Sequence, residues 1–257
     1  MKTFHIIIKG IVQGVGFRPF VYKLAKSLQL KGWINNTVNG VHIHVNTNEE
    51  MSLHFIKELE SKSPKLSVIT SIEIHEIPFI SYSNFEIKES SNQTSPSLLI
   101  TPDFGMCKDC NEELFSEEND RYQYPFITCT NCGPRYSIIN SLPYDRETTT
   151  MDSFCMCKHC NNEYHDPINR RYYSQTNSCP NCRIELSYFE NGKLQENFTD
   201  LDYIAEQWRQ GNIVSIKGIG GYLITCDASN KEAVSRLRIL KNRPTKPFAL
   251  MYPNISS

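Results

Sequence analysis

Long apolar stretches and net charge are both scarce in this sequence. None of its 257 residues lies in a run approaching the roughly 18 apolar residues that a membrane-spanning helix requires. The opening segment MKTFHIIIKG lacks a basic stretch followed by a sustained apolar run, which argues against a secretion signal. The formal net charge is only -1, and the composition is ordinary for a soluble protein of one to three domains. We therefore expect no membrane partner, and the reduced, metal-bound thiols predicted below indicate a cytoplasmic protein.

Cysteine is abundant and regularly spaced. Eight of the ten cysteines form two copies of one frame, in which two CxxC pairs are separated by eighteen residues. Four thiolates suit the tetrahedral shell of a structural zinc ion, so the frame predicts two zinc sites. A disulfide framework is the alternative, and it would require an oxidising environment. Cys155 and Cys226 fall outside the frame and receive no role. The predicted ligands are Cys107, Cys110, Cys129 and Cys132, then Cys157, Cys160, Cys179 and Cys182.

The cysteine frame belongs to a longer repeat. Five further residues recur fifty positions later, which indicates a duplicated ribbon-like segment over residues 103–186. They are Asn111, Glu113, Asn119, Arg121 and Tyr122, repeated as Asn161, Glu163, Asn169, Arg171 and Tyr172. This segment is acidic, because residues 103–190 contain 8 Lys and Arg against 14 Asp and Glu. Binding to nucleic acid requires the opposite field, so we expect no nucleic-acid partner.

The first ninety residues alternate between strand and helix patterns. Phe4, Ile6 and Ile8 have the period of a strand, and Phe20, Leu24 and Leu28 have that of a helix. Two strands, 32–38 and 41–47, meet at Asn39-Gly40, which favours a tight hairpin. A second helix contains Leu53, Ile56 and Leu59 or Glu60 on one face, and strands are expected at 68–77 and 84–88. This order is typical of a ferredoxin-like βαββαβ sandwich.

A glycine-rich turn, residues 10–18, connects the first strand to the first helix. Its backbone N–H groups and the helix dipole favour an anion, and Arg18 could hold two phosphoryl oxygens. The Gly-Lys-Ser or Gly-Lys-Thr of a Walker loop is absent. A tight turn with an ordinary surface arginine fits the pattern equally well.

The last part of the chain follows a polar stretch, 187–199, that predicts a linker or hairpin at Asn191-Gly192. A helix is expected from about Asp200, a buried strand at 213–217 and a second helix at 231–241. A basic cluster around this helix end could bind nucleotide phosphates, although a solvated helix end explains it too. The candidates are Lys217, Lys241, Arg243 and Lys246.

The strings GIVQGVGFR and GWINN resemble the acylphosphatase signature. This resemblance implies that Arg18 is catalytic, that Asn36 rather than Asn35 orients the attacking water, and that the turn binds phosphate. Acyl phosphates have a good leaving group, so such a site needs neither a nucleophilic side chain nor a metal. The implied phosphate-binding residues are Gln13, Gly14, Val15, Gly16, Phe17 and Arg18.

Together with the zinc frame, the strings KGIGGY, CDA and RLRILKNRPTKPFALM closely resemble the carbamoyltransferases of [NiFe]-hydrogenase maturation, the HypF family. The implied class is α+β. An acylphosphatase domain would cover 1–91, a duplicated four-cysteine zinc-ribbon region 103–186, and an incomplete YrdC-like α/β nucleotide-binding domain 199–257. That last domain would stop at about a third of its usual length and leave a half-built parallel sheet. We therefore expect residues after about 200 to be less ordered or aggregation-prone.

The resemblance also implies a reaction. Carbamoyl phosphate would be hydrolysed at the Arg18 and Asn36 site, and ATP with magnesium would convert the carbamate to carbamoyl-adenylate. A domain beyond this chain would transfer the carbamoyl group to a cysteine of a partner maturation protein for cyanide-ligand synthesis. Two alternatives stay open: a free-standing acylphosphatase with a zinc appendage, and a non-catalytic zinc scaffold or adaptor.

Overall fold

The computed structural model describes residues 1–90, 99–182, 184–195 and 201–252. The chain divides into two compact units, 1–184 and 185–257, each described by itself. The acylphosphatase-like and zinc-binding regions share the first unit. The predicted domain limits at 91 and 199 and the helix start near Asp200 lie outside the described residues.

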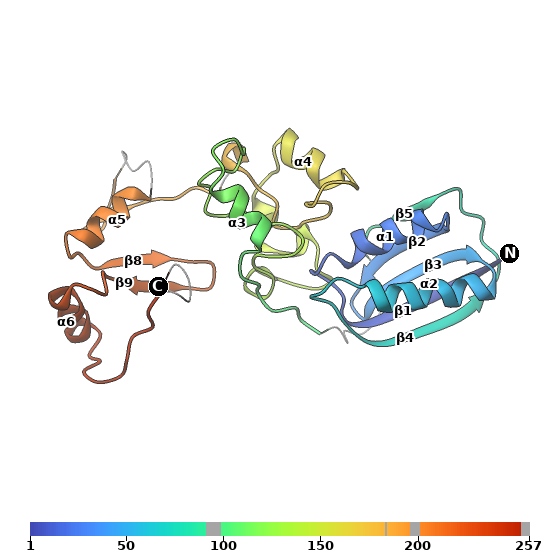
Figure 1. The fold of residues 1–257 in the computed structure, drawn as a ribbon, viewed down its shortest axis with the longest axis horizontal. Coiled ribbons are helices and arrows are strands. Elements are labelled where there is room, and N and C mark those ends of the chain that lie inside the picture. The colour runs from blue at the N-terminus through green and yellow to red at the C-terminus, as the bar shows by residue number, and fades with distance from the viewer. Residues whose placement is uncertain (91–98, 183, 196–200, 253–257) are drawn as a thin grey trace. The chain divides into compact units, whose positions relative to one another are not determined.

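A five-stranded sheet covered by two helices forms the first domain, with strand order β4-β1-β3-β2-β5 (Figure 1). All neighbouring strands are antiparallel except β2 and β5, which are parallel. The predicted βαββαβ order is confirmed, and the short β5 adds an edge strand. The elements are β1 (Lys2–Ile11), α1 (Phe17–Ser27), β2 (Lys31–Thr37), β3 (Gly40–Thr47), α2 (Glu49–Lys62), β4 (Val68–Ile77) and β5 (Phe85–Ile87).

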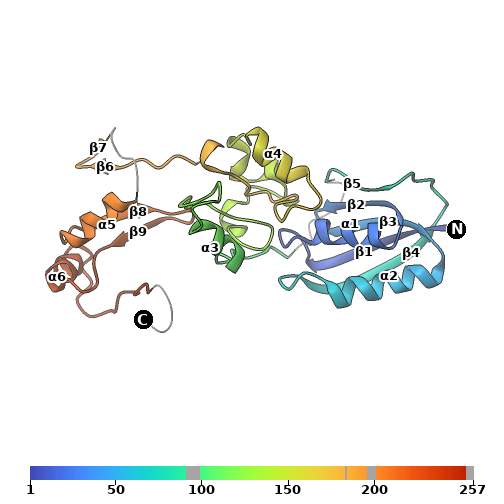
Figure 2. The ribbon, with the colours of Figure 1, turned by 45° about the horizontal axis from the view of Figure 1, so that its top comes forward.

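One face of this sheet carries the main core. Phe4, Ile6 and Ile8 point to the helices because strand side chains alternate, and they are buried. Both helices lie on that face (Figures 1 and 2). The prediction for α2 was wrong in one residue: Leu53 is 58% exposed, whereas Leu59 is fully buried. The buried stripe of α2 contains Ser52, Phe55 and Leu59, and Leu53 projects one residue away from it.

The zinc-binding region contains little regular structure. Its two helices, α3 (Lys108–Leu114) and α4 (Lys158–His165), each begin one residue after the first cysteine of a frame. This equivalence extends the fifty-residue repeat from sequence to structure. Short 3-10 turns lie at Tyr136–Ile138, Arg146–Thr148, Thr150–Ser153 and Pro180–Cys182.

The described residues of the second compact unit form two small antiparallel sheets and two helices. A hairpin joins β6 (Phe189–Glu190) to β7 (Lys193–Leu194) at the expected Asn191-Gly192 turn. The elements that follow are α5 (Asp202–Arg209), β8 (Val214–Lys217), β9 (Tyr222–Thr225) and α6 (Lys231–Leu240). Strands β8 and β9 pair antiparallel, so the parallel pairing expected here is wrong for this pair.

Within its described part, the second unit buries only Ile204, Ala233 and Leu237 among hydrophobic residues. Strand β9 leaves Tyr222 and Leu223 exposed. The lower order expected after about 200 stays a prediction. Across the described residues of the whole chain, no helix combines the length and apolarity needed to cross a membrane.

Candidate active site and zinc centres

The turn between β1 and α1 depends on glycine. Gly14 and Gly16 have φ angles of 69° and 75°, in the left-handed region that residues with a Cβ rarely adopt. A Cβ at Gly14 would also lie 3.0 Å from the side chain of Arg135. Gly16 is the N-cap of α1, so the first N–H groups of this helix are presented where the turn ends.

A small cavity, partly open to solvent, lies at this turn. One wall comes from the acylphosphatase-like domain and the other from the zinc-binding region. Two arginines line it, and no carboxylate or histidine is among its lining residues. The lining residues are Val12, Gln13, Gly14, Gly16, Phe17, Arg18, Pro19, Asn36, Thr130, Arg135, Tyr144, Tyr173, Ser174 and Gln175.

Arg18 and Asn36, predicted from one motif each, meet at this cavity. In the amide orientation that turns its oxygen to the guanidinium, Asn36 accepts hydrogen bonds from Nη2 at 3.2 Å and Nε at 3.1 Å of Arg18. Arg18 is only 7% exposed and Asn36 only 1%. The alternative of an ordinary surface arginine is therefore wrong.

Residues of the zinc-binding region complete the surroundings of Arg18. Asp145 forms an ion pair with it, with 2.6 Å between Oδ1 and Nη2, and the carbonyl of Tyr144 accepts a second bond from Nη2 at 3.4 Å. The guanidinium carbon lies 5.4 Å from the ring centre of Tyr173, within the range of a cation–π contact. The arginine is thus held from both walls.

The other predicted phosphate-binding residues divide into two groups. Gly14, Gly16 and Phe17 line the cavity. Gln13 also lines it, but its side chain donates to the Thr37 carbonyl at 2.8 Å and accepts from Tyr144 N–H at 3.0 Å. Val15 is fully buried in the core and is not among the lining residues. The role of Gln13 thus includes holding the two walls together.

Arg135 is a second buried guanidinium at the cavity. It is 2% exposed, and its N–H groups donate to carbonyl oxygens, among them that of Gly14. None of the ion pairs found in the described part of the chain involves it. Arg135 therefore contributes a positive charge to the cavity that no carboxylate pairs with among the described residues, whereas Arg18 is paired with Asp145. Sequence spacing gave no signal for Arg135, because it lies 121 positions from Gly14.

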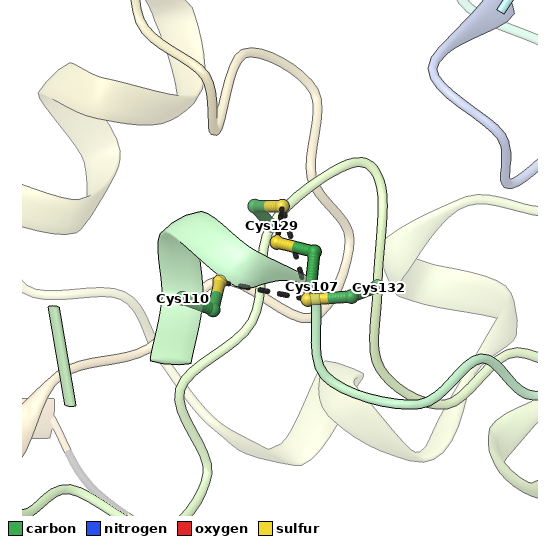
Figure 3. A group of neighbouring side chains, drawn as sticks. All are labelled: Cys107, Cys110, Cys129 and Cys132. Atoms are coloured by element: carbon green, nitrogen blue, oxygen red, sulfur yellow. Dashed lines mark hydrogen bonds between the residues drawn. The ribbon is translucent and has the colours of Figure 1, made fainter. Parts of the chain in front are cut away.

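The eight predicted cysteines gather in two clusters, and Figure 3 shows the first. Neighbouring sulfur atoms in the first cluster are 3.5–3.8 Å apart, and those in the second 3.6–3.8 Å. A tetrahedron with Zn–S bonds of about 2.3 Å has edges of about 3.8 Å. The cysteines are unpaired by disulfides, so the geometry fits a four-thiolate metal site rather than a disulfide framework.

The pKa is lowered for one thiol in each cluster, Cys132 and Cys182, and raised for the buried Cys110 and Cys160. Hydrogen bonding with Cys110 and Cys129 lowers the pKa of Cys132. Burial raises the pKa of Cys182, but backbone hydrogen bonds outweigh it and lower that pKa to about 7. Thiolates are the form that binds metal.

The repeated arginines and glutamates connect the two zinc-ribbon repeats reciprocally. Arg121 of the first repeat donates to Glu163 of the second at 3.0 Å and to the carbonyl of Ser178 at 2.8 Å. Fifty positions on, Arg171 pairs with Glu113 of the first repeat and donates to the carbonyl of Thr128 at 3.1 Å. The repeated residues thus hold one repeat against the other.

An arginine of each repeat also donates a hydrogen bond to a cysteine sulfur of the other repeat. Arg170 donates to the sulfur of Cys110 at 2.9 Å, and Arg121 to that of Cys160 at 3.5 Å. Four thiolates around a divalent ion leave about two negative charges, which these guanidiniums offset. Burial opposes ionisation of Glu163, but hydrogen bonds from Arg121 lower its pKa.

Two of the predicted nucleotide-binding residues of the second unit are in contact, because Arg243 Nε donates to the Lys246 carbonyl at 3.3 Å. Lys217 donates to the neighbouring Gly218 carbonyl at 2.8 Å, and Arg243 to Pro247 at 2.7 Å. Nucleotide binding by this set stays a prediction.

Comparison with protein families assigns each part of the chain. A model described as "Acylphosphatase" matches residues 4–87, one described as "HypF finger" matches 106–139 and 156–188, and one described as "Telomere recombination", of the Sua5/YciO/YrdC type, matches 206–257. An acylphosphatase of Thermotoga maritima is 40% identical over 89 residues, which are 34% of this chain and 98% of that protein. The first domain is therefore of the acylphosphatase class.

Relatives that match along the whole chain specify the family more closely than the first domain does. A carbamoyltransferase HypF of Synechocystis is 47% identical over 257 residues, covering 99% of this chain and 33% of that protein. A solved structure described as full-length HypF in the phosphate- and nucleotide-bound form is 40% identical, with a TM-score of 0.90 over 99% of this chain and 33% of its own. The chain corresponds to the N-terminal region of HypF proteins, with an acylphosphatase domain, the HypF zinc finger and the start of a Sua5/YrdC-type domain, and it spans about a third of the length of the curated relatives it matches. The predicted α+β class is confirmed with it.

Proposed function

We propose that this chain hydrolyses carbamoyl phosphate at the cavity beside Arg18 and Asn36. The observation that carries the proposal is the contact between these two buried side chains at a glycine turn, where a second buried arginine adds positive charge. The match of residues 4–87 to acylphosphatases and the phosphate-bound HypF relative support a phosphoryl site here.

The reaction requires charge stabilisation and a positioned water. The turn amides and Arg18 hold the phosphoryl oxygens, and Asn36 orients the water. The water oxygen bonds to phosphorus as the bond to the carbamoyl oxygen breaks, and the electron pair leaves with carbamate. The water proton passes to a phosphoryl oxygen, because none of the lining residues is a carboxylate or histidine. The products are carbamate and phosphate.

The similarity to HypF proteins extends this proposal beyond hydrolysis. ATP with magnesium would activate the carbamate at the YrdC-type segment, and the carbamoyl group would pass to a cysteine of a partner maturation protein. The two cysteine clusters would hold structural zinc, since each fills its four positions with protein thiolates. Reduced thiolates suit the cytoplasm.

Phosphate release from carbamoyl phosphate by the zinc-loaded chain tests the hydrolytic step. Replacing Arg18 with alanine should lower the rate by about 10²–10³, since the arginine stabilises charge at the reacting phosphoryl group. Arg209→Ala, at an arginine that is 70% exposed on α5, is the matched control and should keep the rate. Absence of release by the unmodified chain, or an equal rate in Arg18→Ala, would refute the proposal.

A free-standing acylphosphatase activity is the second candidate. It is favoured because the match to this chain spans 98% of the Thermotoga maritima acylphosphatase, which therefore consists of this domain alone. This candidate predicts equal hydrolysis of carbamoyl phosphate and other acyl phosphates, so comparing the substrates separates the two functions.

A further inference from the structure

The cavity wall formed by the zinc-binding region contains three buried polar groups without hydrogen-bond partners among the described residues. One is the Tyr144 hydroxyl, and the other two belong to the neighbouring residues Ser174 and Gln175. Ser174 and Gln175 both line the cavity, and each is 2% exposed. Neither Ser174 Oγ nor Gln175 Nε2 has a hydrogen-bond partner in the described structure. Buried polar atoms are nearly always paired, so three orphans in one cavity wall indicate a missing ligand.

The Gln175 side chain is fixed in orientation. Its Oε1 accepts a hydrogen bond from the Tyr164 hydroxyl at 3.0 Å. The opposite end of the amide, Nε2, is therefore a donor of defined position. The neighbouring Ser174 hydroxyl can donate or accept, so the pair offers one fixed donor and one adaptable group.

We propose that Ser174 and Gln175 form the recognition site for the carbamoyl end of the substrate. Gln175 Nε2 donates to the carbonyl oxygen, and Ser174 Oγ accepts from the amino group. This inference rests on the proposed function, in which Arg18 and the glycine turn hold the phosphoryl end. A planar carbamoyl group, with an amino group beside a carbonyl oxygen, offers the donor and acceptor that these two orphans need.

Such a site distinguishes acyl phosphates by the hydrogen-bonding groups of their acyl end rather than by their size. Acetyl phosphate has nearly the same shape, but a methyl group replaces the amino group. It would satisfy Gln175 and leave Ser174 buried without a partner. Sites built to hydrogen-bond a substrate group reject analogues that lack it. Ser174 is therefore a specificity residue, and Gln175 contributes to both substrates.

The test compares kcat/KM for carbamoyl phosphate and acetyl phosphate, using the whole zinc-loaded chain. In Ser174→Ala we expect carbamoyl phosphate to lose about tenfold and acetyl phosphate to be unchanged, the value of one hydrogen bond. In Gln175→Glu, which keeps the acceptor for Tyr164 but loses the donor, both substrates should lose about tenfold or more. Ser61→Ala, at an exposed serine on α2, serves as the control.

Each outcome decides between distinct conclusions. An unchanged substrate ratio in Ser174→Ala, with hydrolysis intact, overturns the recognition site and leaves the hydrolytic function standing. Equal losses with both substrates in Ser174→Ala, at normal zinc content, show a structural role and also overturn it. Absence of hydrolysis in the unmodified chain removes both proposals. If Ser174→Ala fails to fold, Gln175→Glu decides: full activity toward both substrates overturns the site.

Discussion

The sheet domain and the zinc-binding region lie in one compact unit, yet they are stabilised in opposite ways. The sheet domain buries one continuous cluster of seventeen hydrophobic residues. The zinc-binding region has two clusters of five and three residues, and the larger includes three of the zinc-frame cysteines. Its buried residues include Arg121, Arg135 and Arg171, each at most 4% exposed.

This difference shows what metal coordination permits. A short segment with little apolar area cannot offset the entropy of folding by burial alone. We propose that metal bound by the two four-cysteine clusters takes that role here, while the buried arginines and glutamates satisfy one another's charge. The same polar interior provides the cavity wall with charged and hydrogen-bonding groups that an apolar core would lack.

Zinc removal should produce the largest difference in stability between the two regions. Chelation under reducing conditions should unfold the zinc-binding region, because its metal-binding energy is folding energy, and leave the sheet domain folded. Cys160→Ser should lower zinc content and produce protease cleavage after residue 99, whereas Cys155→Ser, at an exposed cysteine outside both clusters, should do neither. Metal analysis and limited proteolysis measure this. Unfolding of the sheet domain on zinc removal would contradict the proposal that the two regions are stabilised in different ways.

A substitution in the apolar core should destabilise the sheet domain and leave the zinc-binding region unaffected. Phe55→Ala should lower the free energy of unfolding of the sheet domain by about 3–5 kcal/mol, since Phe55 is fully buried in its apolar cluster. Leu53→Ala on the same helix, at a residue 58% exposed, should change it by less than about 0.5 kcal/mol. Urea unfolding provides the values. Zinc content in native buffer should stay unchanged in both variants.

Acid should weaken the sheet domain by a smaller amount. Burial, with the charge of His5, lowers the pKa of both His42 and His44 to about 4 from the ordinary 6.5. Between pH 6.5 and 4 the unfolded chain therefore binds more protons than the folded one, and stability falls as the pH falls. Because both side chains are only half-buried, we expect a loss on the order of 1 kcal/mol.

Trp33 can report this effect locally, since its ring stacks 4.2 Å from that of His44. Urea midpoints followed by Trp33 fluorescence at about pH 7 and about pH 5, in a Trp208→Phe background, measure it. His42→Gln should reduce the pH dependence, and His54→Gln, at an exposed histidine of α2, should not. A pH dependence unaffected by His42→Gln would assign the acid effect elsewhere.

Local patterns explain what sequence could predict. Alternation in Phe4, Ile6 and Ile8, a tight hairpin near Asn39 and the regular cysteine spacing each depend on near neighbours in the chain, and the structure has each of them. The predicted turn at Asn39-Gly40 was wrong by one residue, because Gly40 already pairs with Thr37 in the sheet and the turn residues are Val38 and Asn39. Leu53 shows the limit of such patterns, because several residues of an amphipathic helix fit a hydrophobic stripe and only packing selects among them.

The second wall of the cavity had no local signal. Asp145 lies 127 positions from Arg18, and irregular chain and short turns position it rather than a periodic element. Arg135, Ser174 and Gln175 likewise approach the glycine turn only once the zinc-binding region has folded. Contacts of this kind follow from tertiary packing, which neither periodicity nor motif spacing encodes.

The reciprocal pairing of Arg121 with Glu163 and Arg171 with Glu113 has one more consequence. When residue i of one copy meets residue j of another, and j meets i, the contact is isologous, as between the subunits of a two-fold symmetric homodimer. The duplicated segment therefore carries such an interface inside a single polypeptide. Either copy alone would present an unmatched arginine and an unmatched glutamate.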